Sequence, residues 1–122
     1  MACRAYRLDE VPVGAVVVYQ GRIIARAHNY VERFHSTLAH AEVLAILMSQ
    51  KRLGQKYLDQ CCLYVTLQPC SMCAHAIALT RIQRVYFGAY ESRANVPRPE
   101  WIGGILETDC QNLLSMFFHQ KR

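Results

Sequence analysis

The stretch "CLYVTLQPCSMCAHAIALTRIQRVYFGA" (residues 62–89) decides the fold that this sequence predicts. It opens on a short apolar run rich in β-branched residues, 62–67, which favours a buried strand. Pro69 precedes a second apolar segment, about 71–80, which we expect to be a helix, and residues 84–89 are typical of another strand. Strands that alternate with helices indicate an α/β fold, in which helices pack on a central sheet.

The chain before this stretch predicts a hairpin and then a helix. The runs "AVVVY" (15–19) and "RIIARAH" (22–28) flank a Gln-Gly turn signal at residues 20–21, so we expect a β-hairpin there. A helix is expected over residues 40–53 and ends at Gly54. Because its apolar residues go nearly all the way round, we expect this helix to be buried.

The chain after residue 89 predicts a loop and a last helix. Residues 90–104 contain two prolines and two glycines, so we expect a loop that holds at most one very short strand. Apolar residues then recur at helical spacing and predict a C-terminal amphipathic helix, namely Leu106, Cys110, Leu113, Leu114 and Phe117. A chain of 122 residues is expected to form one domain, residues 1–122.

Composition favours a globular protein with an anionic partner. Apolar residues make up 52%, but the longest apolar runs are far shorter than the roughly 20 residues of a membrane helix. The first ten residues lack an apolar signal-peptide core, so we expect a soluble, cytoplasmic protein. The net charge of +5 favours nucleic acid as a partner. Six cysteines without a secretion signal argue against a disulfide scaffold.

Two motifs place metal-binding side chains at the starts of two expected helices. The sequence "HAE" (40–42) opens the first helix, and "PCSMC" (69–73) opens the second directly after a strand. Cys70 and Cys73 are three residues apart, so their side chains share one helix face. With His40 they offer three ligands suited to Zn²⁺ and leave a fourth position for water. An open position is typical of a catalytic zinc site.

Glu42 opens a nearly apolar helix, where an unpaired carboxylate is costly. Residues i and i+2 do not face each other in a regular helix, so His40 and Glu42 can flank one ion only at the helix start. A carboxylate beside zinc-bound water can move protons. A lone C-x-x-C is as typical of a redox or structural zinc site as of a catalytic one, and a lone H-x-E carries little information. Their joint occurrence is the signature of zinc nucleobase deaminases.

The sequence also resembles a known family, the bacterial tRNA-specific adenosine deaminases, which convert the wobble adenosine of an anticodon to inosine. The resemblance implies a three-layer α-β-α cytidine deaminase-like fold, with a central mixed sheet of four to five strands flanked by helices. It also implies a homodimer with one Zn²⁺ per subunit that acts on the anticodon stem-loop. The matching stretches are "EVPVGAVVV" (10–18), Asn29, "AHAEVLAI" (39–46), "LYVTLQPCSMCA" (63–74), "RIQRVYFGA" (81–89) and "GILETDCQNLLSMFF" (104–118).

The resemblance assigns roles residue by residue. It makes Glu42 the proton shuttle of a hydrolysis in which zinc hydroxide attacks C6 of adenine, and Glu42 protonates the ring and then the departing ammonia. It makes Asn29 a hydrogen-bonding partner of the flipped base and Phe118 an aromatic that helps to hold the anticodon loop. The implied metal ligands are His40, Cys70 and Cys73, and the implied walls of the base pocket are Val11, Pro12, Ala41 and Leu67.

Departures from the family pattern leave alternatives open. The N-terminal helix and the 90–104 loop are short, Gln68 replaces a glutamate, His75 replaces a glycine, and Ser-Thr-Leu at 36–38 replaces Asp-Pro-Thr. The alternative function is deamination of a free nucleobase or nucleoside of the guanine or cytosine type. Single-stranded DNA is a further candidate substrate. A non-catalytic, zinc-stabilised RNA-binding subunit is disfavoured because the glutamate is present.

The remaining histidines and cysteines have structural interpretations. We expect His28, His35 and His119 to be ordinary surface or partly buried residues. His75 is interpreted as a packing or interface residue. Small buried apolar roles are expected for Cys3, Cys61, Cys62 and Cys110.

Overall fold

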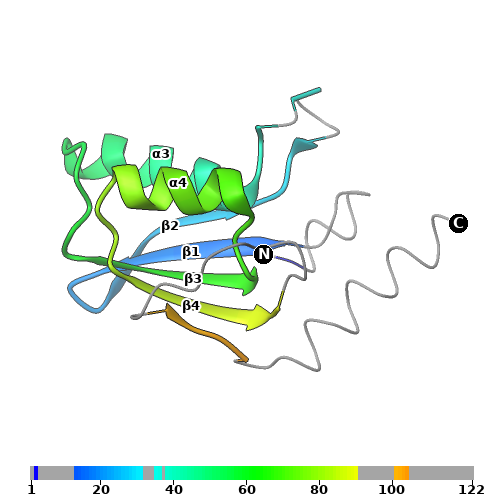
Figure 1. Ribbon diagram of the computed structural model, residues 1–122. Coiled ribbons are helices and arrows are strands. Elements are labelled where there is room, and N and C mark those ends of the chain that lie inside the picture. Colours follow the sequence, from blue (N-terminus) through cyan, green and yellow to red (C-terminus); the bar gives the residue numbers. More distant parts are fainter. Residues whose placement is uncertain (1, 3–12, 32–34, 37, 91–100, 105–122) are drawn as a thin grey trace, which may run out of the picture.

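The computed structural model describes residues 2, 13–31, 35–36, 38–90 and 101–104. These residues form one five-stranded sheet with two helices on it (Figure 1). In chain order the elements are β1 (Gly14–Tyr19), β2 (Arg22–His28), α3 (Ala41–Leu53), β3 (Cys61–Leu67), α4 (Ser71–Leu79), β4 (Arg84–Ala89) and β5 (Trp101–Ile102).

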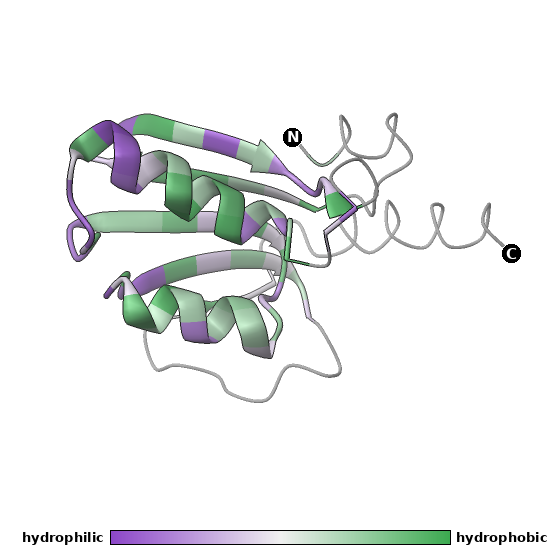
Figure 2. Ribbon diagram, turned by 90° about the horizontal axis from the view of Figure 1, so that it is seen from above, coloured by the Kyte–Doolittle hydropathy of each residue, from purple (hydrophilic) through white to green (hydrophobic). Residues whose placement is uncertain are grey.

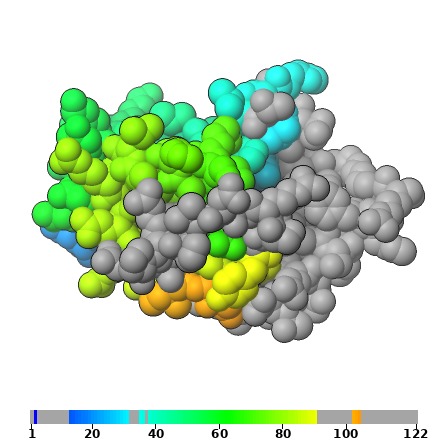
Figure 3. Space-filling view, viewed as in Figure 1, coloured from blue at the N-terminus to red at the C-terminus, as the bar shows by residue number. Residues whose placement is uncertain are grey.

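The sheet is mixed, with strand order β2-β1-β3-β4-β5. Strand β1 runs antiparallel to both β2 and β3, whereas β3, β4 and β5 are parallel to one another. The predicted mixed sheet of a cytidine deaminase-like α/β fold is therefore confirmed. The very short strand expected in the 90–104 segment is β5, which lies beside β4 at the edge of the molecule (Figure 3).

Both described helices cover the same face of the sheet (Figure 1). Helix α3 packs over β1 and β2, and α4 lies beside it. These elements account for two layers of the predicted three-layer architecture. The predicted C-terminal helix, the short N-terminal helix and residues 91–100 lie outside the described residues.

The core lies between the helices and the sheet. Alternate strand residues point toward the helices, and the register aligns Val17 with Leu63 and Leu63 with Val85. All three side chains are completely buried, as is Ile77 of α4. Burying each such side chain contributes roughly 1.5–3 kcal/mol, so this row of residues fixes which face of each strand meets the helices.

The β1–β2 turn has the geometry that its sequence predicts. Gln20 and Gly21 have φ values of 51° and 75°, and positive φ at both central residues is the mark of a type I′ hairpin turn. The handedness of this turn matches the twist of the two strands. The strand residues 15–19 and 22–28 therefore pair as expected, with one irregularity between Val17 and Val18.

Helix α3 is less buried than its sequence predicts. It ends at Gly54 as expected, in the left-handed conformation with φ 64°. However, Leu47 and Met48 are 56% and 48% exposed, so the expectation of an all-round buried helix was wrong. The helix lies on the outside of the sheet, where only one side of it meets the core, and hydrophobic and hydrophilic residues alternate along it (Figure 2).

A search of the described residues for membrane-spanning helices found none of sufficient length and apolar character.

Candidate metal centre and active site

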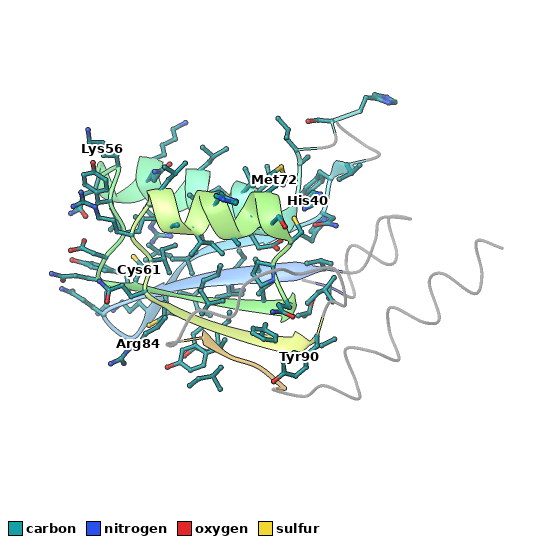
Figure 4. All side chains as sticks on the ribbon, viewed as in Figure 1. His40, Lys56, Cys61, Met72, Arg84 and Tyr90 are labelled. Carbon is teal, nitrogen blue, oxygen red and sulfur yellow. The ribbon has the colours of Figure 1, made fainter. Side chains whose placement is uncertain are left out.

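The site lies where α3 and α4 begin, at the same end of the sheet. His40 is the N-cap of α3 and Cys70 is the N-cap of α4, and both have extended backbone angles. N-cap side chains usually bond to the first free N–H groups of a helix. Neither His40 nor Cys70 makes such a bond, so both side chains are available for another partner. In Figure 4, His40 lies close to Met72 in the first turn of α4.

Three ligand atoms converge between the two helix starts. The ligand atoms of His40, Cys70 and Cys73 all lie within 4.8 Å of one another. The Nδ1 atom of His40 is 3.5 Å from the sulphur of Cys73 and 3.8 Å from that of Cys70. A tetrahedral zinc ion with ordinary bond lengths holds nitrogen and sulphur ligands about 3.6 Å apart. The geometry and the donor types therefore fit one zinc ion.

The electrostatics of this cluster also favour the binding of a cation. Burial lowers the pKa of His40, which keeps its ring neutral and able to bind a metal. Burial raises the pKa of the Cys73 thiol, and the nearby Glu42 and Cys70 raise that pKa further. Three acidic groups crowded into one buried site repel each other when ionised. A divalent cation removes that penalty and favours the thiolates.

Glu42 is part of the same cluster. Its side chain is only 4% exposed, and burial raises the pKa of its carboxyl group to about 7. Hydrogen bonds from its own backbone amide and from the Cys73 side chain oppose that increase. The carboxyl group therefore contacts one of the three ligand side chains. Because His40 precedes the first helical turn with an extended backbone, residues two apart in sequence can both face the site.

Two hydrogen bonds hold the backbone on either side of His40. The side-chain oxygen of Asn29 accepts a bond of 2.8 Å from the Ala41 N–H, and the Tyr30 N–H donates a bond of 2.9 Å to the Ala39 carbonyl. The end of β2 is thereby attached to the start of α3. Since the Asn29 oxygen is already occupied, its amide NH₂ group is the part that can donate to a ligand.

The other pocket residues expected from the sequence fall into two groups. Ala41 is completely buried, and Leu67 is half-buried at the end of β3. Val11, Pro12 and Phe118 lie outside the described residues.

The burial of His28 was underestimated from the sequence. The expectation of a surface or partly buried residue was wrong, because its side chain is completely buried and stacks on Tyr30 with ring centroids 4.1 Å apart. Its Nδ1 lies 3.1 Å from the Asn29 carbonyl, so Nδ1 carries the proton. Its Nε2 atom is also buried and has no hydrogen-bond partner among the described residues. The only signal in the sequence was its position next to Asn29 at the end of a strand.

The structure also shows the burial of the other histidines and cysteines that the sequence analysis discussed. His75 is exposed, and its Nδ1 donates to the Ser71 carbonyl at 2.7 Å, so it does not pack in the core. Cys61 is buried as expected, whereas Cys62 is only half-buried. His35 is exposed as expected. His119, Cys3 and Cys110 lie outside the described residues.

Comparison with known proteins identifies the class of this site. Residues 1–89 match the family model described as "Cytidine and deoxycytidylate deaminase zinc-binding region". The chain therefore belongs to the zinc-dependent deaminases of the cytidine and deoxycytidylate deaminase type. Zinc is its cofactor, and the His–Cys–Cys cluster is positioned to bind it.

Individual relatives show to which family within this class the chain belongs. The tRNA-specific adenosine deaminase of Bacillus subtilis is 41% identical over 99% of this chain and 84% of its own length. A solved structure from a study of A-to-I editing by tRNA:A34 deaminases matches with a TM-score of 0.87 and 38% identity, over 93% of this chain and 92% of that one. Within the class, the chain belongs to the family of tRNA-specific adenosine deaminases.

A guanine deaminase is also similar, over a shorter span. The structure of the enzyme from Bacillus subtilis has a TM-score of 0.71 and 39% identity, and the match covers 75% of this chain and 59% of that one. The two tRNA-specific relatives described above match over more of both chains, so the free-base alternative is not favoured.

Proposed function

We propose that this protein hydrolyses adenosine to inosine at the wobble position of tRNA. The observation that supports this most directly is Glu42 in contact with one member of a three-ligand zinc cluster, in a chain of the tRNA-specific family. The reaction consumes one water and releases one ammonia, and an oxygen replaces the amino group on C6 of the base. When bound, Zn²⁺ supplies the Lewis acidity that activates water at neutral pH.

Glu42 moves the protons of this reaction. Its carboxylate accepts a proton from the attacking water, passes it to a ring nitrogen of adenine, and then transfers a proton to the departing amino group. A group with this task must be close to both the metal and the base. Burial beside Cys73 keeps Glu42 at the metal and limits competing contacts with bulk water.

Asn29 orients the base, because its NH₂ group is left to donate while its oxygen is held by the Ala41 N–H. Leu67 at the end of β3, together with Val11, Pro12 and Ala41, forms the walls of the base pocket, and Phe118 holds the anticodon loop by stacking. A wobble adenosine must leave the anticodon stack to enter such a pocket.

The assembly and location follow from the same proposal. Exposed apolar side chains on the outer faces of the two helices support a homodimer, since Leu47, Met48 and Leu79 are 56%, 48% and 77% exposed. A tRNA substrate places the protein in the cytoplasm, where it binds RNA. Single-stranded DNA presents the same unpaired bases and is a secondary substrate.

The substrate is tested by incubating zinc-loaded protein with three classes of compound: an anticodon stem-loop, single-stranded DNA and free nucleobases. We expect inosine in an anticodon stem-loop with adenosine at the wobble position, little product from single-stranded DNA, and no ammonia from free guanine, cytosine or adenine. Ammonia release from a free base without inosine formation in the stem-loop would overturn the proposal in favour of the free-base alternative.

A further inference from the structure

Exposed cations gather at the end of the sheet opposite the metal centre. We name this group the basic pole, and it consists of Arg22, Lys51, Arg52, Lys56, Arg81 and Arg84. Arg26 is the only other basic residue among the described ranges of the chain. Within those ranges the only acidic residue at this end is Asp59, because the other, Glu42, is buried at the metal centre.

The topology brings these residues together. Helices α3 and α4 both begin at the metal centre, so their C-terminal ends and the loops that follow meet at the other end, where Figure 4 shows Lys56 and Arg84 far from His40. The Leu58 N–H donates to the Thr80 carbonyl at 2.7 Å and joins the two loops. Arg22 and Arg84 are the first residues of strands β2 and β4, which begin at the same end of the sheet. Arg22 pairs with Tyr19 of β1, and Arg84 pairs with Cys62 of β3.

The surface of the basic pole has a recess and an exposed aromatic ring. The recess has a volume of about 310 Å³ and is lined by Asp59, Gln60, Cys61, Cys62, Gln83 and Arg84. Beside it, the Tyr57 ring is 38% exposed, with the Arg81 guanidinium 3.9 Å and the Lys56 ammonium 5.4 Å from its centroid. Cations interleaved with an aromatic ring are typical of nucleic-acid-binding surfaces.

Local structure explains only part of this charge. Lys51 and Arg52 lie in the last turn of α3, where cations stabilise the helix dipole, and Arg52 also donates to the Ile24 carbonyl at 3.2 Å. Arg22, Lys56 and Arg84 lie outside the helices. Like charges at one end of a molecule repel each other, and an anion that binds there relieves the repulsion. The clustering therefore indicates a polyanionic partner.

We infer that the basic pole binds the phosphate backbone of the tRNA substrate at a place outside the anticodon stem-loop, an inference that rests on the proposed function. Helix α3 has 13 residues and separates the two sites by about 20 Å. A base in the metal centre and a phosphate at the basic pole therefore belong to well-separated parts of one RNA. The contact contributes affinity and salt dependence without touching the reacting atoms.

The test measures RNA binding by the triple variant Arg22→Gln, Lys56→Gln and Arg84→Gln. All proteins carry Glu42→Gln, so that binding is scored whether or not deamination occurs. The ligands are whole tRNA and a minimal anticodon stem-loop, each titrated at several salt concentrations. Arg26→Gln is the matched control, because Arg26 is an exposed cation on β2 outside the basic pole. Thermal melting and zinc content establish whether each variant is folded. If the triple variant does not fold, the three single variants are measured in its place.

The triple variant is expected to bind whole tRNA at least about tenfold more weakly at low salt, and its slope of log K against log salt falls by about two to three. Its affinity for the minimal stem-loop, and the affinity of the Arg26 control for both ligands, should stay within about twofold. Equal losses for both RNAs, or no loss for either, would overturn the inference. So would binding to anionic lipid vesicles in place of tRNA. Absence of inosine formation by the protein with Glu42 intact would contradict the proposed function. The binding result could still be interpreted, because the binding assay does not depend on deamination.

Discussion

The side chain of Asn29 holds the backbone of Ala41, with 2.8 Å between the amide oxygen and the N–H. Ala41 lies between His40, whose ring faces the two cysteine sulphurs, and Glu42, whose carboxyl group contacts Cys73. Asn29, which is proposed to bind the base, therefore also holds the backbone between the candidate metal ligand His40 and the proposed proton-transfer group Glu42. The observed bond uses the oxygen of the Asn29 amide and the proposed contact with the base uses its NH₂ group, so the two can be separated by substitution.

Asn29→Asp keeps the oxygen acceptor and removes the NH₂ donor, whereas Asn29→Ala removes both. The alanine variant should lose about 1–3 kcal/mol of stability, because the buried Ala41 N–H loses its partner, and should bind zinc more weakly in a chelator competition. The aspartate variant should retain zinc affinity but lose kcat/KM for the stem-loop. Equal zinc affinity in the alanine variant and the wild type would contradict the positioning role.

Zinc removal should destabilise the protein by an amount that depends on the metal concentration. A bound metal stabilises only the folded state that assembles its ligands. Chelation should therefore lower the melting temperature of the wild type and should leave Cys73→Ala nearly unaffected, since that variant lacks one of three ligands. Scanning calorimetry with and without chelator measures both. A Cys73→Ala protein that still gains stability from stoichiometric zinc would speak against the assigned ligand set.

Gly103→Ala should destabilise the edge of the sheet by about 1–3 kcal/mol. A Cβ atom at this position would collide with the ring of Phe87, which is 4% exposed and cannot move into solvent, and it would lie 2.7 Å from the ring of Tyr90. Denaturant titration of Gly103→Ala, of Phe87→Leu and of the double variant gives the coupling. The smaller leucine should relieve the collision with residue 87 and leave the contact with Tyr90, so strictly additive losses would show that the Phe87 ring is not the obstacle.

The exposed apolar side chains of the helices give a test of the proposed homodimer. Leu79→Glu, at a position 77% exposed on α4, should shift the protein from dimer to monomer with little change in the stability of each chain. Ile23→Glu, at a position 45% exposed on β2, is the control and should leave the dimer intact. Sedimentation at several protein concentrations measures the shift. A dimer that tolerates the Leu79 change would place the interface elsewhere.

Local chemistry explains why much of this fold could be predicted from the sequence. The Gln-Gly turn at residues 20–21, the stop at Gly54 and the strand–helix–strand stretch over 61–89 depend on backbone preferences and spacing, which the sequence states directly. Both halves of the metal cluster lie at helix starts, which the same signals locate. The three ligand positions could therefore be proposed before their distances were known.

Tertiary relationships were beyond the reach of the sequence. The spacing of apolar residues in α3 does not say that Leu47 and Met48 face outward, because that depends on where the helix lies on the sheet. The bond from Ala41 to Asn29 spans 12 residues and requires the β2 end to meet the α3 start. The complete burial of His28 likewise depends on packing, for which its polar character gives no warning.

Glu42→Gln is the most direct test of the central claim, because glutamine keeps the size of the side chain and removes its ability to carry a proton. Zinc content per chain and inosine formation in an anticodon stem-loop should be measured on the same preparations of wild type and variant. We predict about one zinc per chain in both proteins, inosine formation by the wild type, and none by the variant. Inosine formation by Glu42→Gln at a rate near that of the wild type would contradict the role assigned to Glu42.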